Sequence, residues 1–211
     1  MTGLDGGVYL VDSGFAKEDQ ARVREGWDAV KITVGRIRIL VQNILFFAKE
    51  RELKCDRISA FDFVCDVASS LEPKIKAQRV EFECNFDQTM GDIEIDAGVV
   101  RIALINILEN ALDACLEDDV KISHTIVFRA DGDERHVNIE IADNGIGMDQ
   151  ETKENMFTLF FSSKGSKGTG LGLFVSNEII RQHGGSIEVD STPGQGSLFR
   201  VKVPRTPPKA L

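Results

Sequence analysis

Apolar residues recur at alternating spacings of three and four along residues 17–51, a stretch that contains no proline. This heptad pattern is typical of a helix with one narrow apolar seam. A helix of about 35 residues extends about 50 Å, which is more than a small domain covers. We therefore interpret the stretch as a dimerising or bundle helix; the alternative is a long helix that lies on its own domain. The seam consists of Trp27, Val30, Val34, Ile37, Val41, Ile44 and Ala48.

A short apolar segment precedes this helix in the sequence "GLDGGVYLVDSGFAKEDQ". A turn is predicted at Ser13-Gly14, which favours the end of an earlier helix followed by a hairpin loop. Residues 1–54 are thus predicted to be part of a helical hairpin.

After residue 55 the pattern becomes mixed. Phe63, Val67, Leu71 and Ile75 mark a second amphipathic helix. Pro73 predicts a kink or an early end of that helix. The alternating segment "VEFECNF" predicts a half-buried strand. Asp96 is the predicted N-cap of a further helix that ends near Leu116.

The C-terminal half continues the mixture of strands and helices. "TIVFRA" and "HVNIEIAD" predict a hairpin around the turn "DGDE", and "SIEVDS" and "SLFRVKVP" predict a second one around "TPGQG". A helix is expected between them over residues 171–183, ended by Gly184-Gly185. Because strands and helices do not alternate strictly, we expect an α+β sandwich over residues 55–205, followed by a tail at 206–211.

Composition restricts the function. The chain has 211 residues, 42% of them hydrophobic and 28% charged, with a net charge of −9, which argues against non-specific nucleic-acid binding. No apolar run approaches the roughly 18 residues that a membrane span requires. Four cysteines without a C-x-x-C pair argue against zinc and for a reducing, cytoplasmic compartment. The three histidines show no metal-ligand spacing.

The helix "DAGVVRIALINILENALDACL" is apolar almost all round, which predicts burial. Asn106, Asn110 and Asp113 nevertheless fall on one stripe of it. Amide and carboxylate oxygens in an apolar setting suggest a polar ligand or an ion such as Mg²⁺. The alternative is a set of side chains bonded to neighbouring backbone.

Asp143 lies at the end of an alternating strand and is followed by Gly145 and Gly147. A carboxylate in this position can accept a hydrogen bond from a flat heterocycle, and the glycines allow a ring to approach the backbone. The alternative is an ordinary Asp-Asn-Gly turn.

The segment "FFSSKGSKGTGLGLFVSNEII" contains four closely spaced glycines in front of a predicted helix. Its spacing fits neither the dinucleotide fingerprint nor the P-loop. Taken alone, it is equally consistent with a flexible surface loop.

Six segments in this order resemble the ATP-binding domain of sensor histidine kinases, in the superfamily shared with gyrase, MutL and the heat-shock chaperones. They are "NILENALDA", "DNGIGM", "MFTLFFSSK", "GTGLGL", "HGG" and "GQGSLF". The resemblance covers about residues 55–204 and implies a two-layer, Bergerat-type sandwich with a mixed sheet covered by helices. In this family the domain follows a dimerising helical hairpin, whose second helix the heptad stretch resembles.

The resemblance implies ATP and Mg²⁺ as ligands. It implies that Asn110 binds the metal, that Asp143 recognises the adenine amino group with a water supported by Ser197, and that the glycine segment is the ATP lid. Lys164 is the expected cationic phosphate partner, with Lys167 as the second choice. The full set of implied nucleotide-binding residues is Asn110, Asp143, Gly145, Ile146, Gly147, Lys164, Lys167, Gly168, Thr169, Gly170, Leu171, Gly172 and Ser197.

One departure from the family concerns Asp113, which stands where many histidine kinases have a lysine. A subgroup with a similar lid resembles this chain better, and there the lid lysine can supply the missing charge. Glu109 is a candidate to accept a proton from the attacking imidazole; a surface salt bridge is the alternative.

Three functions compete. The first is a histidine kinase that passes the phosphoryl group to a response-regulator receiver domain. The second is an ATP-hydrolysing machine like gyrase or MutL, which uses a glutamate where this chain has Asn106; an amide cannot take a proton from water, so hydrolysis is expected to be poor. The third is an anti-sigma-type serine kinase or a nucleotide-sensing module, which the long heptad helix disfavours.

We expect a homodimer through residues 17–51 and no binding of nucleic acid. Membrane attachment, if any, would come from segments outside this chain. No histidine precedes His124, whereas the family carries its phosphoacceptor on the first hairpin helix. The chain is therefore expected to be a fragment that binds ATP but does not phosphorylate itself on histidine.

Overall fold

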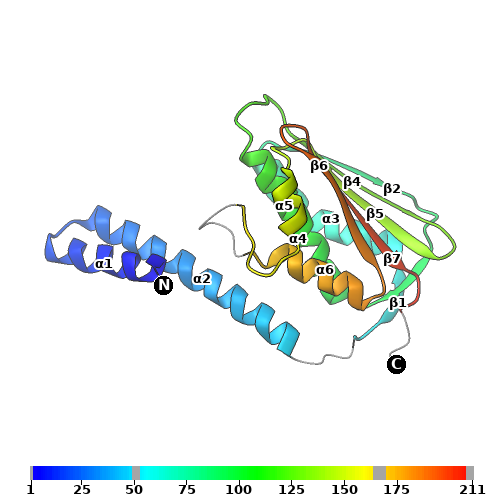
Figure 1. Cartoon of the computed structure of the whole chain (residues 1–211), viewed down its shortest axis with the longest axis horizontal. Coiled ribbons are helices and arrows are strands. Elements are labelled where there is room, and N and C mark those ends of the chain that lie inside the picture. Colours follow the sequence, from blue (N-terminus) through cyan, green and yellow to red (C-terminus); the bar gives the residue numbers. More distant parts are fainter. Residues whose placement is uncertain (1, 49–52, 164–169, 208–211) are drawn as a thin grey trace. The chain divides into compact units, whose positions relative to one another are not determined.

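The computed structural model describes residues 2–48, 53–163 and 170–207 (Figure 1). The chain forms two compact units, Met1–Arg51 and Glu52–Leu211. None of the helices within the described residues is long and apolar enough to cross a membrane.

The first unit is an antiparallel helical hairpin of α1 (Thr2–Ala16) and α2 (Gln20–Ala48). Glycines allow the two helices to approach closely: a Cβ added to Gly26 would lie 2.7 Å from the carbonyl oxygen of Gly7. The Asp19 carboxylate accepts hydrogen bonds from the N–H groups of Ala21 and Arg22 and so caps α2. The predicted hairpin is present.

The predicted turn at Ser13-Gly14 is wrong. Helix α1 continues through both residues to Ala16, and the chain reverses only afterwards. Gly14 is buried, and a Cβ at this position would lie 2.7 Å from the Val23 side chain of α2. This glycine therefore serves helix packing, which the local sequence does not distinguish from a turn.

Part of the heptad seam is open to solvent in the single chain. Trp27, Val34 and Ile37 are 56%, 44% and 46% exposed, whereas Gly26 is buried against α1. Helix α1 thus packs closely against α2 at Gly26 and leaves these seam residues largely uncovered.

The second unit contains a mixed five-stranded sheet in the order β2-β4-β5-β7-β6 (Figure 1). Its strands are β2 (Glu81–Phe86), β4 (Thr125–Gly132), β5 (His136–Asp143), β6 (Ser186–Thr192) and β7 (Gly196–Pro204). Strand β2 pairs with β4 in parallel, and all other neighbours are antiparallel. Both predicted hairpins, β4–β5 and β6–β7, are present.

Three helices, α3 (Ala60–Ala77), α4 (Ala97–Leu116) and α6 (Gly172–Gln182), cover one face of this sheet (Figure 1). The short helix α5 (Gln150–Asn155) follows the turn after β5. The predicted α+β, two-layer sandwich is thereby confirmed. The core between the layers includes Leu104, Ile107, Leu108, Ile126, Phe128 and Ile141, each less than 2% exposed.

Helix α3 does not end early at Pro73 but continues to Ala77. Leu71 and Ile75, on either side of the proline, are both buried. Burial of these side chains holds the last turn on the core despite the backbone hydrogen bond that proline cannot donate.

Two short strands were not predicted. Strands β1 (Asp56–Ser59) and β3 (Asp92–Ile95) form a separate antiparallel pair. Each has only four residues, so alternation is too brief to be recognised in the sequence.

The N-terminus of α4 is fixed by Asp96, as predicted. Its carboxylate accepts a hydrogen bond from Val99 N, and its own N–H donates to Nε2 of the fully buried His183, at 3.1 Å. The other ring nitrogen, Nδ1, lies 2.8 Å from the carbonyl oxygen of Ile179 in α6. The histidine of the "HGG" segment therefore joins the end of α6 to the start of α4.

Candidate functional site

Asp143 is brought to the end of a central strand. Strand β5 lies between β4 and β7, and its register places Asp143 opposite Ile126 on one side and Ser197 on the other. The side chain follows the buried positions of the strand, so it points toward the helix layer; the residue is only 9% exposed. Its Oδ1 accepts a hydrogen bond of 2.9 Å from Gly145 N.

Burial raises the pKa of the Asp143 carboxyl from its ordinary value to about 6. Hydrogen bonds from Gly145 and Ser197 and the positive charge of Lys121 act in the opposite direction, because they favour the ionised form. At neutral pH the group is thus a largely desolvated, ionised acceptor. Such a carboxylate is suited to accept a hydrogen bond from an uncharged donor such as a ring amino group.

The glycines after Asp143 are required by the packing of the chain itself. A Cβ on Gly145 would lie 2.4 Å from the carbonyl carbon of Ala114 in α4. Gly147 has a φ of +67°, and a Cβ there would lie 2.1 Å from the carbonyl oxygen of Thr192. The sequence suggested a ring approaching these glycines; the structure supplies a different steric reason, and the ring contact stays a prediction.

The remaining residues of this turn are fixed by backbone bonds and a serine pair. Ile146 donates to the Ala114 carbonyl at 3.1 Å, while its side chain is 38% exposed. Ser197 is buried, and its hydroxyl lies 3.0 Å from that of Ser191 on β6. Ser191 also accepts a hydrogen bond from Met148 N. The sequence did not single out Ser191, because nothing local marks a serine that contacts a neighbouring strand.

Asn106, the first residue of the polar stripe of α4, faces the start of α6. Asn106 Nδ2 donates to the carbonyl oxygen of Gly172 at 3.3 Å and lies 3.5 Å from the hydroxyl of Ser176. Asn106 thus has the backbone partner that the alternative interpretation of the stripe anticipated. Asn110 lies one turn further along the same helix, with Asp113 beyond it.

Glu109 forms an ion pair with Lys74 of α3. Both side chains are about half exposed, so the pair contributes little to stability. This is the surface salt bridge that the sequence left as the alternative to a proton-accepting role.

Helix α6 begins without a side-chain cap, unlike α3, α4 and α5, which Ser59, Asp96 and Asp149 cap. Because no side chain caps this helix start, the backbone N–H groups of Gly172 and Leu173 can donate hydrogen bonds to an anion. Leu171, directly before it, is 2% exposed, which leaves only its backbone for ligand contact.

The base of the predicted lid is closed by a hydrogen bond of 3.0 Å from Phe160 N to the carbonyl oxygen of Gly170. Both residues have positive φ, +67° and +64°. The other predicted lid residues, Lys164, Lys167, Gly168 and Thr169, lie outside the described residues.

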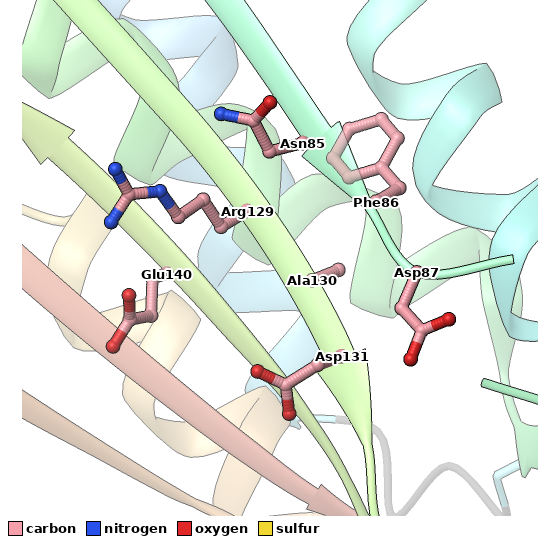
Figure 2. Close-up of a pocket in the computed structure, with 7 residues that line it drawn as sticks. All are labelled: Asn85, Phe86, Asp87, Arg129, Ala130, Asp131 and Glu140. Atoms are coloured by element: carbon pink, nitrogen blue, oxygen red, sulfur yellow. The ribbon is translucent and has the colours of Figure 1, made fainter. Parts of the chain in front are cut away.

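A separate hollow of about 420 Å³ opens at β2, β4 and β5 (Figure 2). Its lining combines one guanidinium with three carboxylates, and none of the predicted site residues belongs to it. The lining residues are Asn85, Phe86, Asp87, Arg129, Ala130, Asp131 and Glu140.

Comparison with known proteins gives a family match over residues 95–207, to the family described as histidine kinase-, DNA gyrase B-, and HSP90-like ATPase. Sporulation kinase E of Bacillus subtilis (strain 168) is 28% identical over 204 residues, which cover 97% of this chain and 26% of the relative. Sensor histidine kinase ZraS of Klebsiella oxytoca is 30% identical over 169 residues, covering 80% of this chain and 36% of the relative. The chain spans about a quarter to a third of the length of these curated relatives.

Solved structures agree with this result. The catalytic domain of histidine kinase ThkA, in a nucleotide-free form, matches with a TM-score of 0.63 and 25% identity, covering 73% of this chain and 97% of that chain. ThkA in complex with the response regulator protein TrrA matches with a TM-score of 0.76 and 22% identity, covering 98% of this chain and 60% of that chain. The second match shows that both units have their counterpart in the ThkA fold.

Ionisation of the buried Asp143 carboxyl lowers the free energy of unfolding, and this effect can be measured. Because its pKa of about 6 in the folded chain lies above the unfolded value, stability falls as pH rises through the range from about 4 to about 6. Asp143→Asn removes this cost, so we expect it to raise the free energy of unfolding near pH 7 by up to about 3 kcal/mol and to give no such gain near pH 4. Denaturant unfolding at both pH values checks this, and an equal effect at both would contradict it.

Proposed function

Because the chain belongs to the histidine kinase-, DNA gyrase B-, and HSP90-like ATPase family, we propose that it binds Mg²⁺–ATP and transfers the γ-phosphoryl group to a histidine, for relay to a response-regulator aspartate. The observation that carries the proposal is the pairing of a buried, ionisable strand-end carboxylate with an uncapped helix start beside a polar stripe of α4. The carboxylate suits recognition of the adenine base, and the helix start suits binding of the phosphates.

The adenine end of the proposed site is built from the turn after β5. Asp143 accepts the amino group of the base, directly and through a water that Ser197 supports. Ile146, with its exposed side chain, lies against the ring together with the backbone of Gly145 and Gly147. Since the turn is held by α4 and by β6, its geometry exists before the nucleotide binds, which reduces the ordering cost of binding.

The phosphate end is proposed at α6 and the lid. The backbone N–H groups of Gly172 and Leu173, at the start of α6, face the phosphates, where the helix dipole also favours negative charge. Asn110 is the proposed Mg²⁺ ligand, through its side-chain oxygen. Lys164 supplies the nearest lid cation, with Lys167 as the second, and the backbone of Gly168 to Leu171 completes the contacts.

Within this proposal the chain positions the substrate and neutralises charge. Bound Mg²⁺ neutralises charge that develops on the phosphates during transfer. Asn106 keeps the first residue of α6 against α4, one turn from Asn110, so the phosphate and metal ends share one support. The pairing of Glu109 with Lys74 leaves its proton-accepting role without structural support.

Hydrolysis of the gyrase or MutL type is the less favoured function. Asn106 occupies the position of the glutamate base in those relatives, and its amide is engaged with the Gly172 carbonyl. Asn106 therefore would not take a proton from a water molecule at this position.

We expect Asn110→Ala and Asp143→Asn to weaken nucleotide binding in different ways. Asn110→Ala removes a metal ligand, so the affinity for ATP falls when Mg²⁺ is present and changes little when it is chelated. In Asp143→Asn the remaining side-chain oxygen accepts from Gly145 N, and an NH2 group replaces the oxygen that would accept from the adenine amino group. Affinity therefore falls about tenfold or more in both conditions. Calorimetry with ATP and GTP checks both variants. Wild-type ATP affinity in both would contradict the site.

Two of the three histidines have ring nitrogens that already contact backbone groups. His183 is fully buried with both ring nitrogens engaged, and Nε2 of His124 lies 3.2 Å from the Asp118 carbonyl oxygen. His136 lies at the start of β5, beside Asp133. None of the three belongs to the hairpin helices.

We therefore expect the chain, incubated alone with γ-labelled Mg²⁺–ATP, to acquire no acid-labile, base-stable phosphate. The same preparation must bind ATP by calorimetry, which separates a missing acceptor from a missing nucleotide site. A label that maps to His124, His136 or His183 would contradict the expectation.

The hairpin is proposed as a homodimer interface through residues 17–51. The exposed seam residues Trp27, Val34 and Ile37 supply the apolar surface that a second copy would cover. A receiver domain of a response regulator is the proposed partner in signalling, in keeping with the ThkA complex.

We expect the double variant Val34→Glu with Ile37→Glu to be monomeric in light scattering, because two charges would be buried in the seam. Ile32→Glu is the matched control: this residue is 55% exposed but lies off the heptad seam, so its variant keeps the dimer. A wild-type chain that is monomeric at high concentration, or a control that dissociates equally, would refute the interface.

A further inference from the structure

The loop between α4 and β4, residues 117–124, contains an ion pair that the proposed function does not use. Lys121 Nζ lies 2.6 Å from Asp118 Oδ2 and 3.2 Å from the carbonyl oxygen of Gly145. The side chain of Asp118 is 4% exposed and also accepts hydrogen bonds from the N–H groups of Val120 and Lys121. Lys121 is thus held by a well-satisfied carboxylate and directed at the turn after Asp143.

Burial of apolar side chains does not hold this loop in place. Val120 and Ile122, on either side of Lys121, are 91% and 104% exposed. The loop is held by polar contacts instead. Asn144 accepts a hydrogen bond from Thr125 N and donates one to the Ser123 carbonyl, and these contacts secure only its C-terminal end.

Lys121 acts on the same peptide group that α4 holds. The carbonyl oxygen of Gly145 accepts a hydrogen bond from Lys121 Nζ. The N–H of the same peptide group, on Ile146, donates to the carbonyl oxygen of Ala114 at 3.1 Å. Polarisation by the ammonium group strengthens the second bond. The preceding peptide group, between Asn144 and Gly145, donates its N–H to the Asp143 carboxylate. The lysine therefore fixes both the turn and the orientation of the carboxylate.

The charge of Lys121 also favours the ionised carboxylate. The other titratable groups on this side are Cys115 of α4, whose pKa is raised to about 12 by burial so that it stays uncharged, and Asp118, whose charge the lysine balances. The hydroxyls of Ser197 and Ser191, on β7 and β6, carry no charge. Among the described residues, Lys121 is the cation whose charge favours ionised Asp143, and the ammonium group of Lys153 in α5 donates instead to the Ser191 carbonyl at 3.2 Å.

We propose that Lys121, anchored by Asp118, is a positioning residue for the nucleotide base, which fixes the Asp143–Gly147 turn and keeps the carboxylate in its ionised, hydrogen-bond-accepting form. The inference rests on the proposed role of Asp143 in adenine binding. It predicts that Lys121 sets the lower pH limit of nucleotide binding.

The test compares the wild type with Lys121→Met and Lys121→Arg. Mg²⁺–ATP affinity is measured by calorimetry between about pH 5.5 and about pH 8.5, and the Asp143 carboxyl is titrated by ¹³C NMR without nucleotide. Lys76→Met is the matched control, because Lys76 forms an equally short pair of 2.6 Å with Glu72 on α3. Titration of the nucleotide phosphates is common to all variants and cancels in ratios of dissociation constants.

For Lys121→Met we expect the Asp143 titration to move upward by about 0.5 to 1 unit. Its ATP affinity then falls up to about threefold relative to wild type near pH 6.5, with a smaller loss near pH 8.5. Lys121→Arg and Lys76→Met should keep the wild-type profile.

A loss of affinity that is equal at all pH values, with an unmoved Asp143 titration, would overturn the inference and leave Lys121 a merely structural residue. A wild type that binds no Mg²⁺–ATP at any pH would refute the proposed function instead. The NMR titration would in that case still decide whether Lys121 controls the charge of Asp143.

Discussion

The candidate site depends on one constraint: an ionisable carboxylate is kept almost entirely away from water at the end of a central strand. Strand β5 can deliver Asp143 there only because β4 and β7 flank it and α4 covers the same side. The desolvation raises the pKa of the carboxyl, and the N–H of Gly145, the buried Ser197 and the charge of Lys121 limit that rise. The polar groups in and around the turn after β5 therefore stabilise the single negative charge of Asp143.

Helix α4 connects this charge to the rest of the site. Its buried residues lie along one face, while the apolar Ile102 and Leu116 are exposed, so the burial that its composition predicted holds for that face alone. Asn106 lies where α6 begins, and its amide donates to the Gly172 carbonyl. The C-terminal turn of α4 holds the loop after Asp143 so closely that only glycine fits at position 145. One helix thus fixes the relation between the strand end and the start of α6, because both are packed against its backbone or its side chains.

The hairpin unit has two kinds of helix surface: a close contact between α1 and α2, and an exposed apolar seam on α2. Gly7 and Gly14 of α1 and Gly26 of α2 bring the two helices so close that an added methyl group would collide with backbone. The seam residues Trp27, Val34 and Ile37 remain exposed on the single chain. Close glycine packing buries little apolar surface, so the larger apolar side chains remain available for another helix.

The sequence by itself determined the elements whose signals are local: the N-cap at Asp96, the almost wholly apolar α4, the β4–β5 hairpin and the arrival of Asp143 at a strand end. Periodicity and capping depend on near neighbours, so they can be recognised without the fold. The tertiary structure decided what depends on distant partners. It showed that Gly14 serves packing rather than a turn, that Glu109 pairs with Lys74 from 35 residues away, and that β2 and β4 run parallel. It alone brought Lys121 and Ser191 to the surroundings of Asp143, since the charge state of a buried group is set by whatever the fold places beside it.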